Sequence, residues 1–174
     1  INDGHLDSIL DAASSIAQEL IDDGQRVAIY ALASPTHFGP LVDFTSDLED
    51  IEAAIGPEGT ARTSEGLGSR DLYGSLIEAM SVLESEGTNT SPVFRSFIVL
   101  TAGTDQAQAM ESSTARSAVR SAIGRSVSVF GVAIGGDGER QALAEVLPQQ
   151  LEMVPDSTAL ADGASQILDI MDER

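Results

Sequence analysis

Hydroxyl and carboxylate side chains follow an unbroken apolar run at residues 97–100. Such a run is typical of a strand covered on both faces in a parallel sheet. Loops at the carboxyl ends of parallel strands are where ligands bind. We therefore take Thr101, Gly103, Thr104 and Asp105 as candidate residues of a partner-binding face. The alternative is structural: Gly103 turns the chain and Asp105 caps the helix that follows.

Other residues capable of chemistry form no catalytic or metal-binding pattern in the sequence. The two histidines, His5 and His37, fall on different predicted elements, and the chain has no cysteine to complete a zinc site. The sequence has no Gly-x-Ser-x-Gly elbow. The glycine turns at 66–68 and 135–138 are too short or misplaced for a dinucleotide fingerprint or a P-loop. We therefore expect no enzyme activity and no catalytic residues.

The composition favours an acidic single domain. The chain has 174 residues, a formal net charge of -19, and nine basic residues that are all arginine. This charge repels phosphate backbones, so we expect no nucleic-acid partner. Neither a transmembrane run nor a signal peptide is visible. The absence of cysteine suits an extracellular or cell-envelope location, with the cytoplasm left open. High-salt adaptation and a GC-rich genome would both give an acidic, lysine-free surface.

Apolar residues recur alternately at helix and strand spacings along the chain. Helices are predicted at 5–22, 48–55, 72–83, 115–123, 139–147 and 160–171, and strands at 26–32, 41–44, 97–101, 127–134 and 151–154. A turn at 34–40 makes a hairpin of the first two strands, and 56–70 is expected to be an exposed loop. Ser46 and Glu49 have capping-box spacing, and Asp156 or Ser157 is expected to cap the last helix.

This alternation predicts an α/β fold with a Rossmann-like, open and mostly parallel sheet. Helices should cover both faces, and the hairpin should add one antiparallel edge strand. No internal repeat or domain boundary is evident, so residues 1–174 are expected to form a single domain.

In order and spacing, these elements resemble a von Willebrand factor type A (vWA) domain. The matching pieces are VAIYAL, LVDFTSDLEDIEAAI, GSRDLYGSLIEA, FIVLTAGTD, VSVFGVAIGG and STALADGASQIL. They run from the first helix to the C-terminus, and their order is more specific than any single piece. The resemblance implies a Rossmann-like fold that binds other proteins, in many members through a metal-ion-dependent adhesion site.

The sequence departs from that metal site in ways that predict a degenerate one. It opens on the first helix, so the first strand and its Asp-x-Ser-x-Ser turn are not present. Where the family has a threonine, the alignment places Arg70 beside Ser69, and Ala102 stands where a carboxylate is expected. A hard cation needs oxygen ligands, and a guanidinium repels it, so we expect no bound metal. Arg70 could instead pair with carboxylates, or it could face solvent while Asp71 serves as a helix N-cap.

These observations predict a non-catalytic protein-interaction or adhesion module of vWA type. Its partner-binding face is expected to comprise Ser69, Arg70 and Asp71 together with the residues from Thr101 to Asp105 named above, without metal or other cofactor. One alternative is an Mg²⁺-dependent adhesion domain whose Asp-x-Ser-x-Ser turn lies upstream, and another is a structural assembly subunit. We also expect the first strand to lie upstream of Ile1 or to come from another chain. The partner is thus another protein or the chain's own upstream segment.

Overall fold

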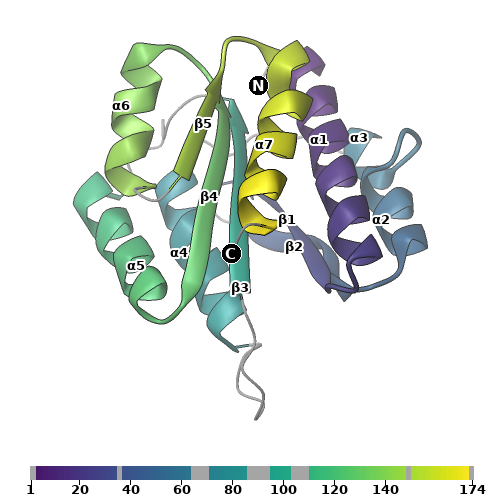
Figure 1. Cartoon of the computed structure of the whole chain (residues 1–174), viewed down its shortest axis with the longest axis horizontal. Helices are drawn as coiled ribbons and strands as arrows, with labels where there is room; N and C mark the ends of the chain where they lie inside the picture. The colour runs from purple at the N-terminus through teal and green to yellow at the C-terminus, as the bar shows by residue number, and fades with distance from the viewer. Residues whose placement is uncertain are drawn as a thin grey trace.

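The computed structural model describes residues 3–34, 37–63, 71–85, 95–102, 110–147 and 150–172. Its helices are α1 (Asp3–Asp22), α2 (Leu48–Ile55), α3 (Thr60–Thr63), α4 (Leu72–Ser85), α5 (Ser112–Gly124), α6 (Asp137–Val146), the 3-10 turn η1 (Ser157–Ala159) and α7 (Leu160–Asp172). Its strands are β1 (Val27–Ser34), β2 (His37–Thr45), β3 (Arg95–Ala102), β4 (Val127–Ile134) and β5 (Gln150–Val154). From β3 onward strands and helices alternate, and the mixture of helices with a parallel sheet confirms the predicted α/β fold class (Figure 1).

Strands β3, β4 and β5 form a parallel sheet in that order. Phe97 lies opposite Val129, and Ala102 lies opposite Ile134, which confirms the predicted pairing of these two segments. β4 is buried at nearly every position because it has a strand on each side and helices on both faces. The three strands point the same way, so Ala102, Ile134 and Val154 mark one end of the sheet (Figure 1). We call this the carboxyl end.

Strands β1 and β2 form a separate antiparallel pair. The predicted antiparallel strand is therefore present, but β2 begins at His37, earlier than expected. The pairing continues to Ser34 opposite His37, so the connection is tighter than the turn predicted at 34–40. Within the described residues, β1 is hydrogen-bonded to β2 and not to β3, so the strands lie in two sheets.

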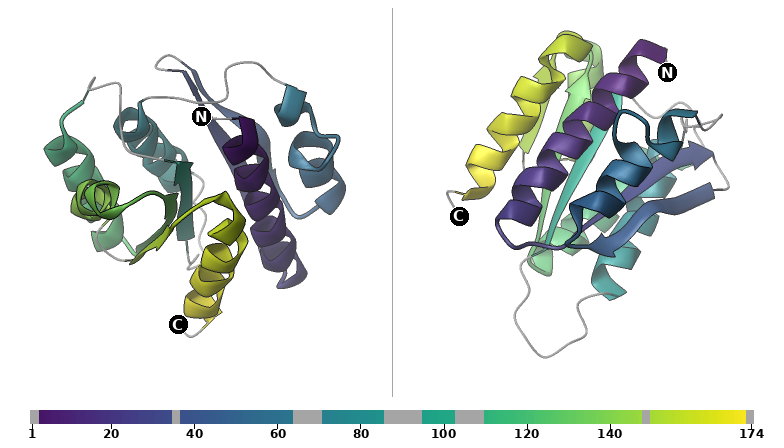
Figure 2. Two further views of the ribbon diagram at one scale, coloured as in Figure 1. Left: turned by 90° about the horizontal axis from the view of Figure 1, so that it is seen from above. Right: turned by 90° about the vertical axis from the view of Figure 1, so that its right-hand side faces the viewer.

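Helices cover both faces of the strands, and each face has its own apolar core (Figure 2). Side chains of α4, α5 and α6 pack together against one face, around Val99 and Val129. Side chains of α1 and α7 pack on the other face, around Phe130 and Val132. A third cluster joins α1 and α2 to the β1–β2 pair and includes the buried Ile51 and Ile55.

The N-terminal caps of α2 and of the turn before α7 test two predictions made from the sequence. The N-cap of α2 is Asp47, whose Oδ1 accepts a hydrogen bond from the Glu49 backbone N–H, so the prediction of Ser46 was wrong. Asp156 caps η1, which leads directly into α7, and this confirms one of the two predicted caps. The predicted loop at 56–70 contains α3, whose Ala61 is almost completely buried.

Candidate functional site

The described part of the chain includes Asp71 and Thr101 from the predicted binding face. Ser69, Arg70, Gly103, Thr104 and Asp105 lie outside the described residues, so their positions stay predictions. Thr101 is half-buried near the end of β3, and Asp71 immediately precedes α4. Tyr73, in the first turn of α4, belongs to the same core cluster as Val99 of β3. The partner-binding face itself therefore stays a prediction.

Asp71 is the N-cap of α4. Its Oδ1 accepts a hydrogen bond from the Gly74 backbone N–H at 2.9 Å, the usual pattern for a capping side chain. The Ser75 hydroxyl donates to the Asp71 carbonyl at 2.8 Å and is itself buried. A Cβ at position 74 would lie 2.5 Å from Oδ2 of Asp71, so glycine is what allows the carboxylate to sit over the first turn. The capping interpretation of Asp71 is confirmed.

A shallow hollow lies between the first turns of α4 and α5 and one side of α6. It has a volume of about 320 Å³ and is lined by Tyr73, Ser112, Gly138, Gln141, Ala142 and Glu145. Each of these helices begins at the carboxyl end of the sheet, which is why residues so far apart in sequence meet there (Figure 2). The lining offers hydroxyl, amide and carboxylate groups, which can donate and accept hydrogen bonds. Its lining contains no histidine, cysteine or lysine.

The turn between β4 and α6 is held in place by backbone and side-chain hydrogen bonds. The Gly135 N–H donates to the Val154 carbonyl at 3.2 Å, which ties the turn to β5. The Gly136 N–H donates to Oε2 of Glu139 at 3.1 Å, so this carboxylate is already used at the start of α6. A Cβ on Gly135 would lie 2.9 Å from the Glu139 Cβ, which explains the glycine. This turn follows β4 and therefore also lies at the carboxyl end of the sheet.

One carboxylate near the carboxyl end has a shifted pKa. The Thr158 hydroxyl donates to Oδ1 of Asp156 at 2.5 Å, and the Thr158 backbone N–H donates to the same atom at 2.9 Å. The side-chain bond, followed by the backbone bond, favours the ionised form and lowers the pKa of Asp156 below its ordinary value of 3.8. Asp156 is exposed and therefore adds fixed negative charge to this end of the molecule.

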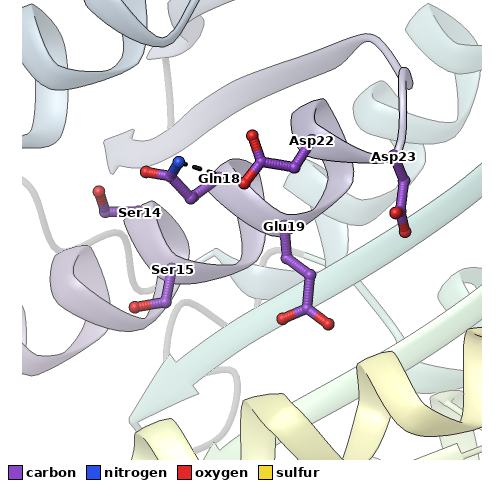
Figure 3. Close-up of a pocket in the computed structure, with 6 residues that line it drawn as sticks. All are labelled: Ser14, Ser15, Gln18, Glu19, Asp22 and Asp23. Carbon is purple, nitrogen blue, oxygen red and sulfur yellow. Dashed lines mark hydrogen bonds between the residues drawn. The ribbon is translucent and has the colours of Figure 1, made fainter.

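A second hollow lies on the last turns of α1. It has a volume of about 430 Å³ and is lined by Ser14, Ser15, Gln18, Glu19, Asp22 and Asp23. Figure 3 shows that these side chains all project from α1 and the turn after it, with Gln18 donating to Asp22 at 3.3 Å. Because α1 ends where β1 begins, this surface is at the opposite end of the strands from the predicted face. It is an acidic helix surface, and we assign it no binding role.

The described residues at the carboxyl end do not fit a hard divalent cation. Ala102 ends β3 without an oxygen-bearing side chain, and Oδ1 of Asp71 accepts the helix-capping hydrogen bond. Throughout the described ranges, no three histidine, aspartate or glutamate side chains gather closely enough to hold a metal ion. Because Arg70 and the residues at 103–105 are outside those ranges, metal independence stays a prediction.

The fold defines a Rossmann-like α/β domain in which α4, α5 and α6 begin at the carboxyl end of the sheet. Neither a protein-family model nor a curated protein matches the sequence. Among solved structures, the chain is similar to proximal thread matrix protein 1 from the mussel byssus. The TM-score is 0.69 and the identity 14%, over 98% of this chain and 43% of that one. At this identity the similarity shows the fold alone, and the chain spans less than half of that structure.

An uncharacterised membrane-spanning protein from Vibrio fischeri is a weaker match. Its TM-score is 0.33 at 18% identity, over 94% of this chain and 84% of that one, which is too low to support an inference. Over the part of this chain that the structure describes, no helix is both long and apolar enough to cross a membrane.

Proposed function

We propose that this chain is a non-catalytic protein-interaction or adhesion module of vWA type, acting outside the cell or in the cell envelope. The observation that carries the proposal is the fold similarity to a byssus matrix protein over 98% of the chain. The order of sequence pieces that resembles a vWA domain supports the same conclusion. The hollow is shallow and lined by hydrogen-bonding groups, which suits protein recognition.

The binding face in this proposal is the carboxyl end, comprising the predicted loop residues and the hollow at the starts of α4, α5 and α6. Binding there is independent of metal. Ala102 provides no ligand, and the Asp71 carboxylate is hydrogen-bonded to the start of α4. Hydrogen bonds from hydroxyl and amide groups would supply the contacts instead, and Arg70 would pair with acidic groups on the partner.

The test uses one substitution at two matched positions. Gln141 and Gln18 are both exposed glutamines inside helices, but Gln141 lines the hollow at the carboxyl end and Gln18 lies on the distant α1 surface. Arginine is a good helix former, so neither Gln141→Arg nor Gln18→Arg should disturb folding. The immobilised domain is used to capture a partner from an extract of its source, and the purified partner is then titrated by calorimetry.

We expect Gln141→Arg to weaken binding at least about tenfold, the equivalent of 1.4 kcal/mol. Gln18→Arg should bind as the unchanged protein does, and chelator should have no effect. Loss of binding in chelator, with recovery in Mg²⁺, would support the metal-dependent alternative instead. Equal effects of the two substitutions would show that the carboxyl end is not the binding face. Self-association of the domain alone, abolished by neither substitution, would favour a structural assembly subunit.

A further inference from the structure

α5 differs in charge from every other long helix that the structure describes. It carries Arg116 and Arg120 and contains no aspartate or glutamate. The other described helices of eight residues or more all contain acidic residues, and only α6 among them also carries an arginine. The stretch from Ser112 to Gly136 has no carboxylate side chain, although the whole chain has 28 aspartate and glutamate residues. α5 is thus a short basic region on a molecule with a formal net charge of -19.

The two arginines lie on the outer side of the helix layer. α5 packs against α4, α6 and β4, and its buried alanine and valine side chains belong to the core cluster on that face of the sheet. Arg120 is exposed and Arg116 is half-buried, and three serines, Ser113, Ser117 and Ser121, are exposed beside them. Within the described part of the chain, no hydrogen bond or ion pair joins either arginine to another residue. Both guanidinium groups are therefore available to a partner.

The placement of the arginines does not serve the stability of α5. Arg116 and Arg120 are four residues apart, so their like charges lie on one side of the helix and repel each other. Neither is in the last turn, where a cation interacts favourably with the helix dipole. A helix selected for stability alone would carry glutamates at salt-bridging positions, and α5 has none. This placement indicates a role in binding rather than in folding.

We infer that the outer face of α5 binds an acidic segment of a partner protein. A guanidinium group pairs with a carboxylate through two parallel hydrogen bonds, and the exposed serine hydroxyls add donors and acceptors. Arg116 and Arg120 are not part of the lining of the hollow at the starts of the helices. The α5 face is therefore a second surface, and binding there is independent of binding at the carboxyl end.

The size of the basic region limits the size of the partner. Arg116 and Arg120 are only about 6 Å apart along the helix axis. Exposed carboxylates occur on the neighbouring elements: Glu111 precedes α5, Glu78 lies on α4 and Glu145 lies on α6. A nucleic-acid duplex or an anionic membrane would extend over these neighbours and be repelled by their carboxylates. A second copy of the chain would bring its own net charge of -19 and be repelled as well. A short acidic segment avoids this repulsion.

The experiment uses the whole chain and a fluorescein-labelled short peptide in which glutamate and serine alternate. Fluorescence anisotropy measures binding at about 0.15 M salt, where the Debye length is about 8 Å and distant charges are largely screened. The test variant is Arg116→Gln with Arg120→Gln, which should fold because glutamine is a good helix former. The matched control is Gln18→Glu with Gln166→Glu. It makes the same change in net charge at exposed positions of α1 and α7, on the opposite face of the sheet.

We expect the arginine variant to weaken peptide binding at least about tenfold, while the control variant binds as the unchanged protein does. Arg116→Lys with Arg120→Lys should bind with intermediate affinity, because lysine keeps the charge but not the paired hydrogen bonds. A peptide with glutamine in place of glutamate should not bind.

Three results would overturn the inference. The first is no binding of the acidic peptide, or an equal loss of binding in the arginine variant and its control. The second is tighter binding of duplex DNA or anionic vesicles that is lost in the arginine variant, because the surface would then recognise phosphate groups. The third is a dimer that forms with increasing concentration and is lost in the arginine variant, because a second copy would then occupy the α5 face.

Discussion

The effect of replacing Gly74 with alanine should depend on the residue at position 71. In the protein as it stands, a Cβ at position 74 would lie 2.5 Å from Oδ2 and 2.9 Å from Cγ of Asp71. The carboxylate would have to rotate away and give up its hydrogen bond to the Gly74 N–H. Losing an N-cap costs about 1 kcal/mol, while replacing a helical glycine with alanine gains up to about 1 kcal/mol. Gly74→Ala alone should therefore change the free energy of unfolding very little.

The double mutant separates these two contributions. Asp71→Ala alone removes the cap and should lower the free energy of unfolding by about 1 kcal/mol. With alanine at position 71 the clash is gone, so adding Gly74→Ala should recover about 1 kcal/mol and return the protein to its original stability. The expected coupling between the two positions is therefore about 1 kcal/mol, which exceeds the error of additivity for independent sites.

Urea denaturation at pH 7 gives the four free energies, and calorimetry checks them, since 1 kcal/mol corresponds to about 2–4 °C in Tm at this size. Asp71→Asn is the control, because asparagine caps as well as aspartate and should leave stability unchanged. If Gly74→Ala stabilises the unmodified protein by its full helix-propensity gain, or if the two substitutions are additive, Asp71 is not the cap. If Asp71→Asn keeps stability but weakens partner binding, the charge of Asp71 contributes to recognition.

Three further substitutions test the core and the carboxyl end. Leu100→Asp places a carboxylate in the α1–α7 core cluster at a cost of several kcal/mol, and a cooperative urea transition near the original midpoint would contradict the assignment of β3. Gly163→Ala would bring a Cβ to 2.9 Å from a methyl group of Val132, so Tm should fall despite the better helix propensity, and a rise would refute this close packing. Thr158→Val removes the hydroxyl donor to Asp156, so the pKa of Asp156 measured by NMR should rise towards 3.8. Because the folded pKa is lowered, the stability from this contact is present above the unfolded pKa and is lost as the pH falls through the folded value.

Strong local patterns in the sequence predicted most of the elements. β4 was predicted to the residue, because its apolar run is bounded on both sides and its burial on both faces requires no alternation. The cap of α2 was assigned wrongly because Ser46 and Asp47 are both good capping residues, and only the hydrogen bond to Glu49 distinguishes them. α3 was missed because a helix of four residues has no measurable periodicity, although its Ala61 is buried.

The candidate site was harder to predict than the fold. Tyr73, Ser112 and Gly138 are separated by tens of residues, and no single motif contains all three. They meet because α4, α5 and α6 all begin at the carboxyl end, and this follows from strand order rather than from local sequence. The first turns of α5 and α6, which each follow a parallel strand, are the signal that could have located Ser112 and Gly138.

At β3 the burial that the sequence predicts differs from the burial that the structure shows. The apolar run of β3 predicted a strand covered on both faces, and helices do cover both faces, yet Phe97, Ile98 and Leu100 remain half-buried. Helix packing alone therefore cannot account for this sequence, because β4 has the same cover and is buried through its second strand neighbour. In natural proteins the levels of organisation usually agree, and a local disagreement marks a functional position. The partial exposure of β3 thus follows from its place in the sheet, where β4 is its one hydrogen-bonded neighbour among the described strands.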